Sequence, residues 1–132
     1  MIKWKLGGIE RVGLFFGGFM VVSHLLRVAM HFLPPAREEA YVEVYFSYAC
    51  AFLVNFLLAL LFEDWGMRDA TISGALIALR IVVANFTLAY GAATHPGTLI
   101  AIFFILWIGH ILASFGVSSA ALIRPCISRA RT

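Results

Sequence analysis

Charged residues are scarce in this chain. Asp, Glu, Lys and Arg make up 13% of its 132 residues, whereas 62% are hydrophobic, and the mean hydropathy is +0.93. A water-soluble domain of this size keeps a large share of its surface in water, so it could not hide so much apolar surface. The composition therefore excludes an ordinary soluble domain and indicates a protein whose solvent is lipid.

Acidic residues are missing from the middle of the apolar stretches, and Glu43, near the start of one stretch, comes closest. Proton-coupled cation transport generally uses an intramembrane Asp or Glu, and a cation channel needs a negative interior. The sequence therefore disfavours both of these classes.

The common catalytic motifs are also missing. The chain has no HExxH, GxSxG, CxxC or phosphate-binding glycine loop, so we expect binding or transport rather than catalysis. Its two cysteines, Cys50 and Cys126, should lie at different membrane depths, which argues against a disulfide, and they have no zinc-site spacing.

Four apolar stretches are present instead, each near the roughly 20 residues that span about 30 Å of hydrocarbon. Short breaks rich in Pro, Gly or charged residues separate them, so consecutive helices should be antiparallel neighbours. We predict one all-α membrane domain, residues 1–132, with four transmembrane helices in an up-down-up-down bundle. The predicted spans are 12–33, 41–62, 70–90 and 98–123.

The basic residues predict how this bundle is oriented. Most of the ten Lys and Arg residues fall on one side of the predicted membrane, only Arg37 falls on the other, and two lie inside spans. The positive-inside rule places the basic side, with both termini, in the cytoplasm. We expect the first apolar stretch to be retained as a signal anchor. Because topology explains the net charge of +3, no nucleic-acid partner is expected. The basic side comprises Lys3, Lys5, Arg11, Arg68, Arg124, Arg129 and Arg131.

Arg80 is the most unusual residue, because it lies at the centre of the third predicted span. An arginine at that depth costs about 2.5–3.5 kcal/mol to insert, and intramembrane charges generally face a bundle interior and carry function. Arg27 and His24 in the first span, Asn55 in the second and His110 in the fourth lie at comparable depths. We predict that these five residues form a cationic pocket, with Arg80 as the main anion contact. The alternative is that backbone carbonyls, Asn55 and a neutral imidazole satisfy Arg80.

The first span carries a stripe of small and polar residues. Gly13 and Gly17 should admit a neighbouring helix closely, and His24 and Arg27 follow them on the same stripe. We expect the polar half of this stripe to face the pocket. An alternative for Arg27 is that its side chain extends outward to Glu43.

These residues favour a small membrane protein that binds or translocates an anionic small molecule or a lipid-linked headgroup. The expected partners are the bilayer and copies of the chain or other membrane subunits. The alternative is a non-catalytic accessory or anchor subunit, in which Arg80 pairs with a carboxylate of another subunit. A less favoured alternative is a b-type haem held by His24 and His110, which should adjoin if the first and last helices pack together.

Overall fold

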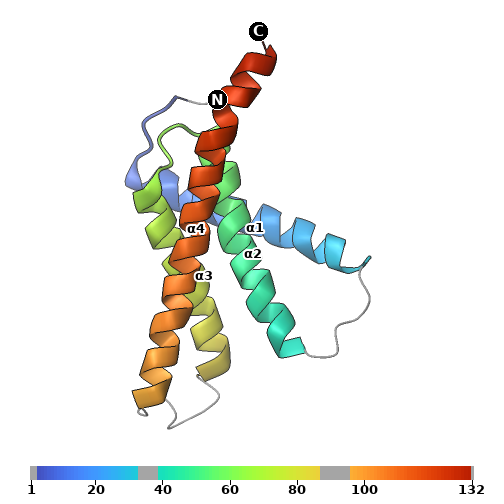
Figure 1. The fold of residues 1–132 in the computed structure, drawn as a ribbon, viewed down its shortest axis with the longest axis vertical. Helices are drawn as coiled ribbons and strands as arrows, with labels where there is room; N and C mark the ends of the chain where they lie inside the picture. The colour runs from blue at the N-terminus through green and yellow to red at the C-terminus, as the bar shows by residue number, and fades with distance from the viewer. Residues whose placement is uncertain (1–2, 33–38, 87–95, 132) are drawn as a thin grey trace.

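The computed structural model is all-helical and describes residues 3–32, 39–86 and 96–131. Four α-helices follow one another along the chain, in agreement with the predicted fold class (Figure 1). Arg37, on which part of the orientation argument depends, lies outside the described residues. The helices are α1 Gly8–Met30, α2 Glu39–Leu61, α3 Met67–Phe86 and α4 Pro96–Arg131.

Each predicted span overlaps one helix over most of its length, and each helix begins a few residues earlier than expected. Residues 33 and 87–90 of the predicted spans lie outside the described residues. Three helical segments are long and apolar enough to cross a membrane: Gly8–Met30, Val44–Leu61 and Leu99–Ala130. Among the described residues, α3 is not one of these segments. The composition of the other three helices suggests a membrane-embedded protein.

The C-terminal helix is longer than predicted. The sequence suggested an end at residue 123, because Arg124 and Pro125 follow, but α4 continues through Pro125 to Arg131. Proline in a helix interior removes one backbone hydrogen bond and generally costs about 3 kcal/mol. Arg124 helps to hold this part of α4 in place, because its guanidinium donates to the carbonyl oxygens of Ala59 and Phe62 at the end of α2. Carbonyls in the last turn of a helix lack partners within the helix, so the bond to Ala59 satisfies one of them.

Helices α2, α3 and α4 form the packed centre of the molecule. α4 lies against both α2 and α3, and the three helices run in alternating directions (Figure 1). Tyr48 on α2 donates its hydroxyl hydrogen to the carbonyl oxygen of Ile105 on α4 at 3.2 Å. The N-terminal residues and the C-terminus lie at the same end of the molecule in Figure 1.

α1 differs from the other helices in its direction. It runs across α3 and α4 rather than alongside them (Figure 1), and its extended contacts are with α2. Its buried side chains, Phe15 and Val22, are two helical turns apart and face α2 together with Gly18. The prediction that the first and last helices adjoin is therefore wrong, because α1 and α4 share no extended interface among the described residues.

Glycines set the closest helix contacts, but not the glycines that the sequence suggested. A Cβ on Gly74 of α3 would lie 2.6 Å from the carbonyl oxygen of Gly109 on α4, so these two backbones meet directly. Gly13 and Gly17 of α1 face open space, and Gly18 is the glycine that lies against α2. The prediction was wrong within this chain because the α2-facing side of α1 is set by Phe15 and Val22.

Candidate functional site

Two arginines on different helices converge on one aromatic ring. The guanidinium carbon of Arg27 on α1 lies 5.7 Å from the centroid of the Phe46 ring on α2. The guanidinium carbon of Arg80 on α3 lies 5.8 Å from the same centroid and 5.8 Å from the centroid of Phe19 on α1. Residues from three helices therefore build this candidate site, which we call the arginine–phenylalanine cluster: Phe19, Arg27, Phe46 and Arg80.

The antiparallel register of α1 on α2 brings Arg27 to Phe46. A Cβ on Gly18 would lie 3.5 Å from Val54, and the Ser23 hydroxyl lies 3.8 Å from the Cys50 sulfur. Residue numbers thus rise along α1 as they fall along α2, and the next contact toward the end of α1 is Arg27 with Phe46. The side chains at 18, 22 and 26 share a face of α1. Arg27 lies outside this face, is exposed, and reaches Phe46 with its long side chain.

The aromatic rings explain much of how Arg80 is accommodated. A cation over an aromatic face gains about 0.5–1 kcal/mol when exposed and about 2 kcal/mol or more when desolvated. Two such contacts are comparable with the roughly 2.5–3.5 kcal/mol cost of inserting an arginine at mid-membrane. Arg80 is half-buried between its rings, whereas the Arg27 side chain is exposed on the outside of the helices. Arg27 is thus the member of the cluster that is most accessible at the surface.

Like charges that share a ring also repel each other. The two guanidinium carbons lie 5.7 Å and 5.8 Å from the same Phe46 centroid, so the distance between them cannot exceed the sum of these two values. Two unit charges about 10 Å apart repel by about 1.5–2 kcal/mol at an effective dielectric constant of ~20. A bound anion would convert this repulsion into two attractions, and the planar guanidinium fork suits carboxylate and phosphate oxygens.

Asn55 has a different environment from the one predicted. Its side-chain oxygen accepts hydrogen bonds from the Trp65 indole at 3.0 Å and from the Ser73 hydroxyl at 2.8 Å. Its amide nitrogen donates to the carbonyl oxygen of Ala51 at 2.8 Å. Asn55 is fully buried, so this network ties the middle of α2 to the start of α3 and to the loop between them.

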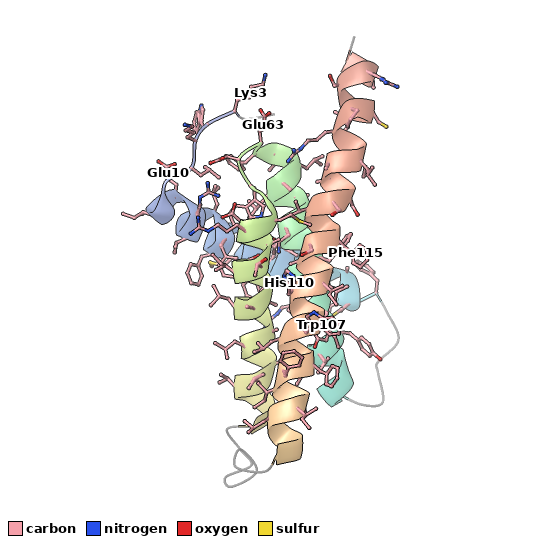
Figure 2. The ribbon with its side chains drawn as sticks, turned by 60° about the vertical axis from the view of Figure 1, so that its left-hand side comes forward. Lys3, Glu10, Glu63, Trp107, His110 and Phe115 are labelled. Atoms are coloured by element: carbon pink, nitrogen blue, oxygen red, sulfur yellow. The ribbon has the colours of Figure 1, made fainter. Side chains whose placement is uncertain are left out.

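The two predicted histidines lie on different surfaces. His24 is exposed on α1, on the side opposite to the buried Phe15 and Val22. His110 lies midway along α4 (Figure 2), and its Nδ1 atom is buried without a hydrogen-bond partner among the described residues. Since α1 and α4 share no extended interface there, the premise for a shared haem does not hold. The described residues also contain no group of three or more His, Cys, Asp or Glu side chains that could hold a metal ion.

An ionic contact that sequence reasoning missed holds the start of α1. The Arg11 guanidinium pairs with the Asp64 carboxylate at 2.6 Å and with the Asp69 carboxylate. Asp64 also accepts the backbone N–H of Leu6 at 2.9 Å, and Asp69 accepts that of Gly66 at 3.1 Å. The signal was present in the sequence, because Arg11, Asp64 and Asp69 all flank spans at the same predicted membrane surface.

The structure thus brings together two of the five predicted site residues, Arg27 and Arg80, at the Phe46 ring, and Phe19 also lies against Arg80. The sequence did not single out the two phenylalanines, because aromatic residues are common in apolar spans. Glu43, the suggested partner of Arg27, has its side chain outside the described residues. No protein family matches the chain, and no curated protein or solved structure matches it either.

Proposed function

We propose that this protein is a small integral membrane protein that binds an anionic ligand at the arginine–phenylalanine cluster. The candidate ligands are a small anion, a carboxylate-bearing molecule or a phosphorylated lipid headgroup, held for binding or translocation. The observation that supports this proposal is the convergence of Arg27 and Arg80 on the Phe46 ring. Arg27 is the outer contact and Arg80 the inner one.

In this proposal the chain crosses the membrane four times, with both termini in the cytoplasm. The N-terminal residues and the C-terminus lie at the same end of the molecule in Figure 1. Most Lys and Arg residues belong to that end, so the positive-inside rule supports this orientation. Arg27, in the last turn of α1, is then toward the outer surface. An anion entering from the outer leaflet or the outer solution would meet Arg27 before Arg80.

Asn55 and His110 stay outside the proposed first contacts. The side-chain oxygen of Asn55 already accepts two hydrogen bonds, and the Nδ1 atom of His110 is buried on α4. A haem held by His24 and His110 forms no part of the proposal.

Native mass spectrometry of protein extracted gently from its own membrane tests the proposal. We expect a recurrent anionic adduct on the wild-type protein that is lost in Arg80→Ala and weakened in Arg27→Ala. Arg68→Ala is the matched control, because it removes the same charge from the exposed first turn of α3. Retention of the adduct in Arg80→Ala, or equal loss in Arg68→Ala, would count against the cluster as the site.

The second candidate function is an accessory subunit of a larger membrane complex. The observation that favours it is the exposure of α1: only 11% of the most apolar window of this helix is buried within the chain. In that case Arg80 pairs with a carboxylate of another subunit. The same spectra distinguish the two functions, because a defined mass that contains other polypeptides, without an anionic adduct, supports the subunit.

A further inference from the structure

Ser23 lies on the same side of α1 as the two residues that this helix contributes to the arginine–phenylalanine cluster. Phe19 precedes Ser23 by four residues and Arg27 follows it by four, so the three side chains follow one another about 6 Å apart along the helix axis. Phe19 lies against the Arg80 guanidinium, and Arg27 lies against the Phe46 ring. Ser23 therefore stands between the two contacts that α1 makes in the cluster.

The contacts of α2 and α3 place the cluster at the level of Ser23. The Ser23 hydroxyl lies 3.8 Å from the Cys50 sulfur, and Cys50 follows Phe46 by about one helical turn. The Arg80 guanidinium carbon lies 5.8 Å from the centroid of Phe46 and 5.8 Å from that of Phe19. One of these rings lies a turn before Ser23, and the other meets α1 a turn after it. Arg80 therefore enters the cluster at the level of Ser23.

The Ser23 hydroxyl has only a weak partner within the chain. Among the described residues its polar contact is the Cys50 thiol at 3.8 Å, and sulfur is a weak hydrogen-bond acceptor. Ser23 is half-buried. Hydrogen bonds to an ionised group are roughly twice as strong as those between neutral groups, so this hydroxyl gains free energy when a charged oxygen replaces the thiol. Ser23 is thus placed to donate to an anion that the two arginines hold.

The geometry points to a phosphate monoester as the ligand of the cluster, with Arg27, Arg80 and Ser23 as its three donors. This assignment rests on the proposed function, because it names the chemical class of the anion bound there. A phosphate monoester carries a charge of about −1.5 to −2 near pH 7 and three acceptor oxygens. Two guanidinium groups balance that charge, and the serine hydroxyl supplies a donor from a third direction.

A carboxylate suits the same three donors less well. It carries one negative charge on two oxygens, and a single guanidinium satisfies both oxygens through a bidentate contact. The charge of the second guanidinium would then be left without a matching anion, so part of the repulsion between Arg27 and Arg80 would persist. The donor set therefore favours the phosphate.

Two lipids that share their acyl chains and differ in their headgroup test the ligand class. Phosphatidic acid ends in a phosphate monoester, whereas diacylglycerol hemisuccinate ends in a carboxylate. In neutral-lipid nanodiscs we expect the wild-type protein to bind phosphatidic acid about tenfold more tightly or better, because it gains a charged hydrogen bond and a second charge pair. Equal affinities for the two lipids, or tighter binding of the hemisuccinate, would overturn the phosphate as the ligand class.

Ser23→Ala tests the hydroxyl. Alanine is the stronger helix former, so α1 should keep its structure. We expect the affinity for phosphatidic acid to fall about tenfold, because a hydrogen bond to a charged oxygen is lost, and the affinity for the hemisuccinate to change by less than about twofold. Ser118→Ala, at an exposed serine of α4, is the matched control and should bind both lipids like wild type. Unchanged binding of phosphatidic acid in Ser23→Ala, or an equal loss for both lipids, would overturn the role of Ser23.

Arg80→Ala distinguishes failure of the Ser23 contact from failure of the proposed function. If neither lipid binds the wild-type protein, or if both still bind Arg80→Ala, the cluster is not an anion site and both proposals fail. If binding is lost in Arg80→Ala and unchanged in Ser23→Ala, only the Ser23 contact fails. Competition with inorganic phosphate identifies the source of the ligand. Displacement of phosphatidic acid supports a soluble phosphate, and its persistence supports a lipid phosphate.

Discussion

Trp65 donates its indole N–H to the side-chain oxygen of Asn55 at 3.0 Å, and this bond joins the α2–α3 loop to the middle of α2. Both residues are buried, and Ser73 donates to the same oxygen. An amide that was predicted to contact a ligand thus holds two helices and their connection in register.

Asn55→Leu should destabilise the protein by about 1–3 kcal/mol, because the indole and the Ser73 hydroxyl would lose their shared acceptor inside the protein. Equilibrium unfolding in mixed detergent micelles measures this change. Ser118→Ala, at an exposed position on α4, is the control and should stay within about 0.5 kcal/mol of wild type. If Asn55→Leu behaved like the control, the network would not be stabilising.

Gly74→Ala should loosen the contact between α3 and α4. The added methyl group would lie 2.6 Å from the carbonyl oxygen of Gly109 and 2.9 Å from the Ala113 Cβ, so the helices must separate. Overpacking of this kind typically costs about 1–3 kcal/mol. Gly8→Ala, where nothing lies within 4 Å of the new atom, should be neutral or stabilising in the same unfolding assay. Equal stability of the two variants would contradict the close contact.

Phe46→Leu should weaken the cluster by removing the ring that both arginines approach. We expect loss of the anionic adduct and faster hydrogen exchange in the last two turns of α1, because two cation–π contacts of about 0.5–2 kcal/mol each disappear. Phe46→Tyr keeps the ring and should retain both properties. Phe103→Leu, at an exposed phenylalanine of α4, controls for loss of an aromatic side chain. If hydrogen exchange in α1 of Phe46→Leu were as slow as in the wild-type protein, the Phe46 ring would not hold α1 in place.

Arg11→Gln should free the start of α1 from the α2–α3 loop. The Asp69 carboxylate is mostly buried and Arg11 is partly exposed, so we expect a loss of about 1–2 kcal/mol, less than for a fully buried pair. We expect backbone hydrogen exchange to increase first in residues 8–14. Lys5→Gln, on the exposed N-terminal segment, removes a charge without removing these bonds. Increased exchange throughout the chain, rather than in this segment, would contradict a local role.

The sequence predicted the elements of the fold well. The four helices lie where the apolar stretches and their breaks placed them, because hydrocarbon thickness fixes the length of a span and Pro, Gly and charged residues interrupt it. It could not predict the direction of α1, because low amphipathicity leaves several sides of an apolar helix able to pack. Gly13, Gly17 and His24 were therefore assigned to the inside, whereas Phe15 and Val22 occupy it.

The candidate site was only partly predictable for a related reason. The depth of a residue follows from its distance to the ends of its span, so Arg27, Arg80, Asn55 and His110 were placed at similar depths. The side of the helix on which each residue lies depends on tertiary packing, which directs the Asn55 side chain to Trp65 and Ser73 rather than to the two arginines. Cation–π contacts such as those of Phe46 carry no pattern in a sequence with many phenylalanines.

The central claim is that Arg27 and Arg80 act on the same anion. A double-mutant cycle with Arg27→Ala, Arg80→Ala and both together, measured as binding of phosphatidic acid to the protein in neutral-lipid nanodiscs, tests it most directly. We predict that each single variant weakens binding about tenfold and that the effects are coupled by about 0.5–3 kcal/mol, as expected for residues that share a partner. Unchanged binding in both single variants, or strictly additive effects, would contradict a shared site.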